Sequence, residues 1–342
     1  PPHTQPSHAA PPISSERASQ LGTEGKLTEY QATALLKGQP SLSIDKYLSL
    51  DLIGMGGMGT VFKAIHRPMN RIVAFKMISK HLVASPDQVH RFQREVRVAG
   101  TLENVNIVRA YDADQSKGVH FLVMEYVRGE NLAQTVRRDG PLTVDRAIDC
   151  IRQAANGLRY AHRRGVVHRD IKPSNLMRTR DMLVKVLDLG LADIDDSYRQ
   201  VQRNTIVSQE NTNTRRLAKK YHTEFGAVLG TASFMAPEQS RDAGSADPRS
   251  DIYSLGCTLY FLLTGEPPYK GKTSVDIIAR HCDSEVPSIR HWRPEVSHSV
   301  DAIFRRMMAK CPAERFQSMG DLIAAIEDCE IDPPGMKNDL HA

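Results

Sequence analysis

The sequence lacks the cysteine pattern and the long apolar runs that mark several specialised classes of protein. Its five cysteines, Cys150, Cys257, Cys282, Cys311 and Cys329, are widely spaced and form no C-x-x-C pair. This pattern argues against a disulfide scaffold or a structural zinc site, and it favours a reducing, cytoplasmic setting. Because no apolar run approaches the roughly 20 residues of a membrane-spanning helix, we expect no membrane segment in this chain.

A strong excess of one charge is also missing. The chain of 342 residues carries 45 Lys and Arg against 40 Asp and Glu, a formal net charge of +5. This mild balance does not indicate a nucleic-acid partner, and we expect none. Because the chain begins with Pro1 rather than Met, we expect it to be a piece of a longer protein, and a membrane tether elsewhere in that protein stays open.

The chain changes character along its length. Residues 1–26 are rich in Pro, His, Ser and Ala and are expected to be disordered. Residues 27–46 contain a predicted short helix, "LTEYQATALLK", with Thr28 as its N-cap, which either docks on the main domain or acts as a spacer. A domain is expected over 47–328 and a tail over 329–342.

Within 47–328, short strand-like segments precede a largely helical part. Strands are expected over 47–54, 59–66 and 71–78 and around 107–112 and 119–124, with a helix from Ser85 between them. Further helices are expected over 143–164, 250–264, 274–281, 298–309 and 319–327. The pattern predicts a two-lobed α+β fold with a β-rich N-lobe over about 47–124, a hinge at 125–129, a helical C-lobe over 130–328 and a cleft between the lobes.

The stretch "LIGMGGMGTVFKA", residues 52–64, places four glycines between two strand-like segments. Glycine weakens a strand interior, so this concentration needs a reason. One interpretation is a flexible hairpin turn. The other is a loop whose backbone approaches a ligand, most often a phosphate.

Five further motifs bear on this choice. The segment "VAFK" ends on Lys76, a buried position that needs a counter-charge, which Glu95 on the next helix can provide. The others are "HRDIKPSN" at 168–175, "DLG" at 188–190, "APE" at 236–238 and "DIYSLG" at 251–256. In their joint order, from about Tyr47 to Glu327, these motifs resemble those of the Hanks-type protein kinases, specifically the bacterial serine/threonine group.

The resemblance implies a protein kinase fold and a role for each motif. Gly54, Gly56 and Gly59 would let the loop lie over the phosphates of ATP, and Lys76 would bind the α- and β-phosphates while Glu95 orients it. The remaining ATP contacts would come from residues around the adenine and the hinge: Ile53, Val61, Ala74, Met124, Glu125, Val127 and Met177.

The resemblance also implies the catalytic and metal-binding residues. Asp170 would orient the substrate hydroxyl and accept its proton, and Lys172 would steady the γ-phosphate. Asp188 and Asn175 would hold Mg²⁺ or Mn²⁺. His168 is expected to be a packed core residue rather than a base.

Three residues are expected to brace the fold rather than to do chemistry. Asp251 would hold the backbone of the catalytic loop, and Glu238 and Arg315 would form a buried ion pair.

The segment between Asp188 and Glu238 is long and polar, which indicates a functional or disordered region. Because a buried guanidinium requires an anion, Arg169 predicts control by a phosphorylated residue in this segment. Thr223 is the first candidate, ahead of Thr212 and Thr214. Thr231 would contact the catalytic residues and mark a preference for serine and threonine.

The sequence therefore predicts an ATP-dependent serine/threonine protein kinase that acts on protein substrates and is controlled by autophosphorylation of this segment. Self-association for phosphorylation between copies is a further expectation. Two alternatives stay open: a pseudokinase scaffold that binds nucleotide without turnover, and a small-molecule phosphotransferase of related fold.

Overall fold

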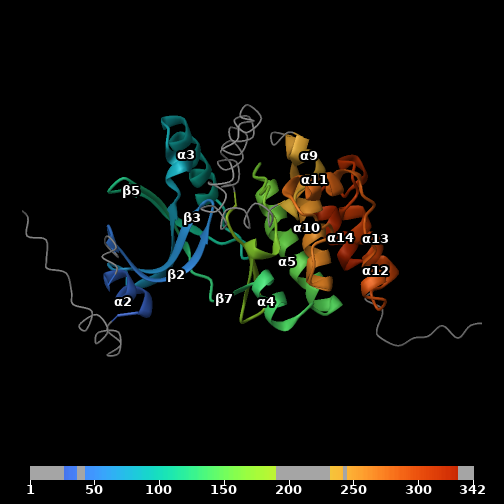
Figure 1. Cartoon of the computed structure of the whole chain (residues 1–342), viewed down its shortest axis with the longest axis horizontal. Helices are drawn as coiled ribbons and strands as arrows, with labels where there is room; N and C mark the ends of the chain where they lie inside the picture. Colours follow the sequence, from blue (N-terminus) through green and yellow to red (C-terminus); the bar gives the residue numbers. More distant parts are fainter. Residues whose placement is uncertain (1–26, 37–42, 190–231, 242–244, 330–342) are drawn as a thin grey trace, which may run out of the picture. The chain divides into compact units, whose positions relative to one another are not determined.

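The computed structural model describes residues 27–36, 43–189, 232–241 and 245–329. The chain separates into two compact units. The smaller unit consists of Pro1–Lys80 with Tyr111–Tyr126, and the larger consists of His81–Ala110 with Val127–Ala342. The predicted combination of a β-rich part and a helical part is confirmed (Figure 1).

The smaller unit is built on a six-stranded sheet with the strand order β1-β2-β3-β4-β6-β5. Its elements are α2 (Glu29–Leu36), β1 (Ser43–Ile44), β2 (Tyr47–Gly56), β3 (Gly59–His66), β4 (Arg71–Ile78), β5 (Ala110–Ser116) and β6 (Val119–Glu125). One face of this sheet carries an aromatic and aliphatic core, made of Tyr47, Phe62, Ala64, Val73, Phe75, Phe121 and Val123.

The larger unit contains most of the helices and a three-stranded sheet of order β7-β8-β9. Its longer elements are α3 (Pro86–Gly100), β7 (Gly129–Asn131), α4 (Leu132–Asp139), α5 (Val144–His162), β8 (Leu176–Thr179), β9 (Val184–Val186), α10 (Pro248–Thr264), α11 (Ser274–Asp283), α13 (His298–Met307) and α14 (Met319–Glu327). Short helices complete it: η1 (Lys80–Val83), η2 (Pro173–Asn175), α9 (Pro237–Arg241), α12 (Ile289–Trp292) and η4 (Pro312–Glu314).

Helix α10 is the centre of the larger unit. Nearly all of its side chains are buried, which is the property of a helix surrounded by others. It packs against α5 and α13, and α14 in turn packs against α5 and α13 (Figure 1). Asp247 caps its N-terminus by accepting a hydrogen bond from the Arg249 amide, and Gly265 ends it in a left-handed conformation.

Most of the expected elements are found within a few residues of their predicted bounds. The helix expected from Ser85 begins at Pro86, and Ser85 and Gln88 form a capping box. The strand expected around 107–112 is displaced, because Ile107 makes only an isolated bridge to Val186 and β5 begins at Ala110. Helix α4 was not expected.

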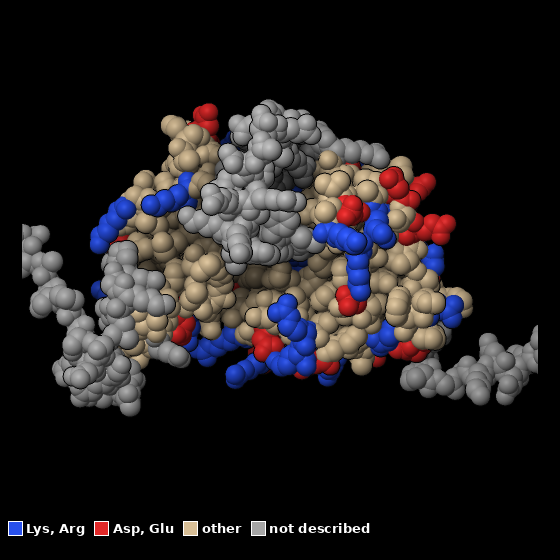
Figure 2. All heavy atoms as spheres, viewed as in Figure 1, with Lys and Arg blue, Asp and Glu red and all other residues tan. Residues whose placement is uncertain are grey.

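The cysteines and the apolar segments can be located in the described residues. All five cysteines lie among them as unpaired thiols. No helix in the described part of the chain is both long and apolar enough to cross a membrane. Figure 2 shows acidic and basic side chains close together on the face in view, as expected from the small net charge.

Candidate functional site

The glycine-rich stretch forms the tip of the β2–β3 hairpin, where Gly56 pairs with Gly59. Gly59 has a φ of +145°, and a Cβ atom there would lie 1.9 Å from the carbonyl oxygen of Met77. The fold itself therefore requires glycine at this position. A Cβ at Gly56 or Gly57 would meet no described atom within 4 Å, so the described surroundings do not require glycine there.

Five of the expected ATP-binding positions share one face of the smaller sheet. Gly54 lies opposite Val61, and Val61 lies opposite Lys76. Ala74 is two residues from Lys76 and lies opposite Met124. Directly opposed residues, and residues two apart on one strand, point to the same side of a sheet. This face is the reverse of the aromatic core.

Lys76 is a buried cation of this face. Its side chain is buried, with 2% of the residue exposed, and its Nζ lies 3.9 Å from the Sδ of Met58 in the glycine turn. The sheet therefore places the lysine beneath the tip of the hairpin. The expected pairing of Lys76 with Glu95 joins the two units, since Glu95 is on α3, and it stays a prediction.

The other expected nucleotide contacts divide between the units. Ile53, half exposed, and Glu125, the last residue of β6, belong to the smaller unit. Val127 and Met177 belong to the larger unit, where Met177 lies on β8 opposite Asn131. The adenine site that would combine them stays a prediction.

The catalytic loop of the larger unit brings three polar side chains together. The Nζ of Lys172 lies 3.0 and 2.8 Å from the two carboxylate oxygens of Asp170. The Nδ2 of Asn175 donates to the Asp170 carbonyl at 2.8 Å and to its Oδ2 at 3.1 Å. The Asp170 carboxylate is therefore oriented from two sides.

The β8–β9 hairpin adds Asp188 to this group. Leu176 pairs with Val186, and the amide of Leu187 donates to the carbonyl of Asn175 at 2.9 Å. Asn175 and Asp188, which flank the hairpin, are thus held near each other. Asp188 has a φ of +54°, an uncommon backbone conformation for a non-glycine residue.

Asn175 and Asp188 suit a magnesium ion chemically. Both offer hard oxygen ligands, and the bonds of Asn175 Nδ2 to Asp170 leave its Oδ1 available. The described residues contain no cluster of three His, Cys, Asp or Glu side chains that could hold a metal alone. Mg²⁺ fits such a sparse set, since it usually keeps several waters and takes the remaining ligands from phosphates.

Asp251 fixes the backbone before Asp170. It is fully buried, and its carboxylate accepts hydrogen bonds from the amides of His168 and Arg169 at 2.9 and 2.8 Å and from His162 Nε2 at 2.7 Å. Burial alone would raise the pKa of Asp251, but the His162 and His168 contacts hold it below its ordinary value. Asp251 therefore stays an anion that organises the loop.

His168 has both ring nitrogens occupied. Its Nδ1 accepts from the Asp170 amide at 3.2 Å, so its Nε2 donates to the Leu187 carbonyl at 2.7 Å. The residue is fully buried. It links the catalytic loop to the segment that carries Asp188.

Arg169 lies within electrostatic reach of Glu95 in the larger unit. Burial raises the pKa of Glu95, and the positive charges of Arg94 and Arg169 partly oppose this rise. Arg169 has a φ of +66°, and its carbonyl accepts a hydrogen bond from Gln239 at 2.8 Å.

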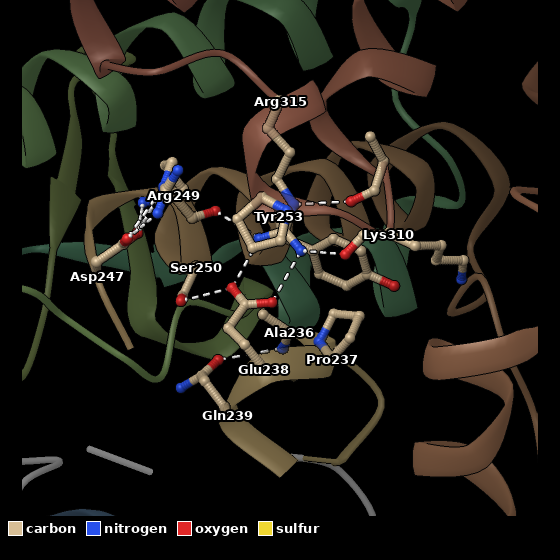
Figure 3. A network of polar contacts seen from close by, with 12 residues as sticks. Ala236, Pro237, Glu238, Gln239, Asp247, Arg249, Ser250, Tyr253, Lys310 and Arg315 are labelled. Carbon is tan, nitrogen blue, oxygen red and sulfur yellow. Dashed lines mark hydrogen bonds and ion pairs between the residues drawn. The ribbon is translucent and has the colours of Figure 1, made fainter. Parts of the chain in front are cut away.

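Glu238 and Arg315 form a bidentate pair, with N···O distances of 2.7 and 2.8 Å (Figure 3). The other N–H groups of Arg315 donate to three backbone carbonyls, those of Ala309, Arg249 and Lys310. All five donors of this fully buried guanidinium are therefore satisfied. Burial would raise the pKa of Glu238, but Arg315 and Ser250 hold it below its ordinary value.

The proposed regulatory threonines, Thr223 and Thr231, lie outside the described residues, as do Thr212 and Thr214. Sequence reasoning did not identify two residues that support the catalytic loop, His162 and Gln239. His162 was not recognisable because its partner, Asp251, is 89 positions away. Gln239 directly follows the "APE" motif, and that adjacency was the available signal.

The comparisons with known proteins agree with this arrangement. Residues 47–324 match the protein kinase domain family. The serine/threonine-protein kinase PknB of Mycobacterium leprae is 38% identical over 291 residues, which cover 83% of this chain and 43% of that protein. The serine/threonine-protein kinase PrkC of Bacillus subtilis is 34% identical over 282 residues, covering 82% of this chain and 40% of that protein.

Among solved structures, the PknI kinase domain of Mycobacterium tuberculosis is similar, with a TM-score of 0.61 and 26% identity. The match covers 83% of this chain and 96% of that domain. The chain spans less than half the length of the curated relatives it matches. From the match over 47–324 and these identities, the chain belongs to the protein kinase domain family, within the bacterial Hanks-type serine/threonine group.

Proposed function

We propose that the chain is an active, ATP-dependent serine/threonine protein kinase that uses Mg²⁺ or Mn²⁺. The observation that carries the proposal is the ordered group of Asp170, Lys172 and Asn175, with Asp188 held beside Asn175 by the β8–β9 hairpin. A family member that had lost turnover would have no need to keep these four side chains together.

In the proposed reaction, Asp170 receives the proton of a serine or threonine hydroxyl as the oxygen bonds to the γ-phosphorus of ATP. The bond from that phosphorus to the β–γ bridging oxygen breaks, and ADP leaves. Lys172, adjacent to Asp170, neutralises charge that develops on the transferred group. The metal ion, held by Asp188 and Asn175, would neutralise the phosphates.

The test is incubation with labelled ATP and Mg²⁺, followed by mapping of phosphorylated residues, in the parent and in Asp170→Asn. The substitution keeps the size of the side chain and the backbone bonds of the loop but removes the base. We expect transfer to fall by about 10²–10⁴-fold, with nucleotide binding retained. Transfer within tenfold of the parent would show that Asp170 is not the base.

We further propose that phosphorylation of the segment between Asp188 and Glu238 controls activity, with Thr223 as the first site. A phosphate adds about −1.5 to −2 charge and three acceptor oxygens, which suits arginine. The test is a variant in which Thr212, Thr214 and Thr223 are all replaced by alanine, so that none can substitute for another. We expect slower phosphorylation of an added substrate, and equal rates would reject this form of control.

We propose that the substrates are proteins and that the kinase domain lies in the cytoplasm. The chain's relatives are named as protein kinases, and the chain includes the "APE" element with its Glu238–Arg315 pair, which supports a protein rather than a small-molecule acceptor. Self-association for phosphorylation between copies predicts that autophosphorylation per molecule rises with protein concentration.

A further inference from the structure

Helix α2 precedes the region that matches the kinase domain, which begins at residue 47. It nevertheless lies beside β2 in the smaller unit (Figure 1). The centroids of the Tyr30 and Phe62 rings are 5.6 Å apart, and Tyr30 packs on the aromatic core. Burial raises the pKa of Tyr30. Of the two roles left open by the sequence, docking is therefore observed, and α2 covers the sheet face opposite to that of Lys76.

Thr28 and Gln31, at the start of α2, bond both to each other and to β2. Thr28 and Gln31 form a capping box, in which the Gln31 amide donates to Thr28 Oγ1 at 3.2 Å and the Thr28 amide donates to Gln31 Oε1 at 3.0 Å. The remaining groups bond to β2. Gln31 Nε2 donates to the Ser49 carbonyl at 2.8 Å, and the Thr28 hydroxyl donates to the Leu50 carbonyl.

These bonds reach an irregular point of β2. Ser49 pairs with Ala64 and Asp51 pairs with Lys63, so Leu50 has no partner on β3. On its other side β2 pairs with β1 only at Tyr47 and Leu48. Such a bulge interrupts the ladder and bends the strand. The helix therefore bonds to β2 at Leu50, which has no partner on β3, and at the adjacent Ser49. Gln31, with 4% of its surface exposed, makes its bond away from water.

The bulge lies four residues before Gly54, and a second register shift follows between Leu52 and Gly54. The tip of the hairpin has few contacts of its own, because Met55 is 73% exposed and a Cβ at Gly56 or Gly57 would lie in open space. The position of a sparsely contacted loop depends on the strands from which it extends. The direction in which β2 leaves the bulge therefore bears on where the glycine loop lies.

We propose that Thr28 and Gln31 are positioning residues for nucleotide binding, which hold the bulge of β2 and so keep the glycine loop in place for ATP. This inference rests on the proposed kinase function. It makes the affinity for ATP depend on a segment outside the matched kinase domain, and detachment of α2 would lower that affinity.

The test uses the full chain with Gln31→Glu and Thr28→Val. Glutamate keeps an oxygen for the capping box but replaces the donor to Ser49 with an acceptor, and valine removes the hydroxyl. Thr28→Ser keeps the hydroxyl and should behave as the parent, and so should Thr33→Ala, which alters an exposed position of the same helix.

We expect the KM for ATP to rise roughly fivefold in Gln31→Glu and Thr28→Val, equivalent to about 1 kcal/mol, the usual net worth of one hydrogen bond. The KM for a peptide substrate and kcat should stay within about twofold, since the catalytic loop is untouched. In the nucleotide-free protein, amide hydrogen exchange over residues 50–58 should be faster than in the parent.

Unchanged nucleotide affinity in both variants overturns the inference, and so does an equal rise in the KM for peptide, which would indicate general loss of structure. If the parent itself transfers no phosphate, the proposed function fails. The Kd of a fluorescent ATP analogue and the exchange rates over 50–58 then still decide whether α2 positions the loop.

Discussion

The buried pair of Glu238 and Arg315 provides the most quantitative test of how the larger unit is held together. Arg315→Met keeps most of the side-chain volume but removes all five hydrogen-bond donors. It leaves the Glu238 carboxylate with the Ser250 hydroxyl, at 2.7 Å, as its remaining side-chain donor. Breaking a buried pair by removing one partner costs about 3–5 kcal/mol, because the other charge stays buried without its partner.

For a domain of this size, that loss corresponds to a fall in Tm on the order of 10 °C. The free energy of unfolding should be measured by urea titration at pH 7 for the parent, Arg315→Met, Glu238→Gln and the double variant. We expect the sum of the stability losses in the two single variants to exceed the loss in the double variant. The difference, which is the coupling energy of the pair, should be at least about 2 kcal/mol.

Arg249→Met is the matched control. Arg249 pairs with Asp247 at 2.6 Å on the N-terminal turn of α10 (Figure 3). Both side chains are about one-third exposed. A pair of this kind contributes about 0–1 kcal/mol. If Arg315→Met costs no more than Arg249→Met, or if the coupling is below about 0.5 kcal/mol, burial is not the reason for the stability of the pair.

The pH dependence has a defined sign. The pKa of Glu238 in the folded protein is lower than its ordinary value of 4.5. Its contribution to stability is therefore fully present above about pH 4.5 and is lost as the pH falls through the lowered pKa. Without Arg315, burial raises the pKa of Glu238 in the variant. The difference in stability between the parent and Arg315→Met should accordingly be largest near pH 7 and should shrink on acidification, first as Glu238 of the variant takes up a proton and until that of the parent does so at its lowered pKa.

Three further predictions concern single positions. Gly59→Ala should lower the free energy of unfolding by more than about 1 kcal/mol because of the clash with Met77. Gly56→Ala should change the free energy of unfolding by less than about 0.5 kcal/mol yet raise the KM for ATP. Equal melting temperatures in the two variants would refute this distinction. Lys76→Met should strongly reduce phosphoryl transfer with an intact fold, and a collapsed melt would make Lys76 chiefly structural. Asp251→Asn should cost about 1.5–3 kcal/mol in urea titration by weakening hydrogen bonds to a charged group, and parent-like stability would contradict its anchoring role.

Much of the helical part could be predicted because its signals are local. Ser85 and Pro86 mark the start of α3, and the apolar positions of α5, α13 and α14 recur at helical spacing. Helix α4 was missed although Asn131 and Gln134 form a capping box at its start. With only eight residues, α4 offers too few turns for periodicity to stand out from the strand before it.

The glycines of the motif have two different physical causes, although the sequence suggested only one. The sequence assigned Gly54, Gly56 and Gly59 to the approach of phosphates. The structure gives Gly59 an independent cause, the carbonyl of Met77, which belongs to a strand that sequence spacing does not connect with it. The described residues require glycine at neither Gly54 nor Gly56, since a Cβ at Gly54 would make only ordinary contact with Val61 and one at Gly56 would meet nothing within 4 Å.

The candidate site was predictable in its members and in one support, Asp251, which the resemblance implied, but not in the supports His162 and Gln239. Asp170, Lys172 and Asn175 are close in sequence, so their association follows from a single loop. Asp251 reaches that loop from α10 and His162 reaches Asp251 from α5, and these contacts depend on how the two helices pack. No pattern in one sequence specifies that packing.

The strained backbone of Arg169 lies between two of these supports, Asp251 and Gln239. A non-glycine residue in the left-handed region costs on the order of 1–3 kcal/mol and persists only where its surroundings over-determine it. Here the amide of Arg169 donates to Asp251 and its carbonyl accepts from Gln239, so both sides of the residue are held.

Gln239 is in turn held by its position on α9. Its Oε1 accepts from the Ala236 amide at 3.1 Å, and its neighbour Glu238 is fixed by Arg315. The pair of Glu238 and Arg315 is thereby connected to the strained residue directly before Asp170. Loss of the pair should then disturb the orientation of Asp170 as well as the stability of the unit, because the strain at Arg169 could relax once α9 is no longer fixed.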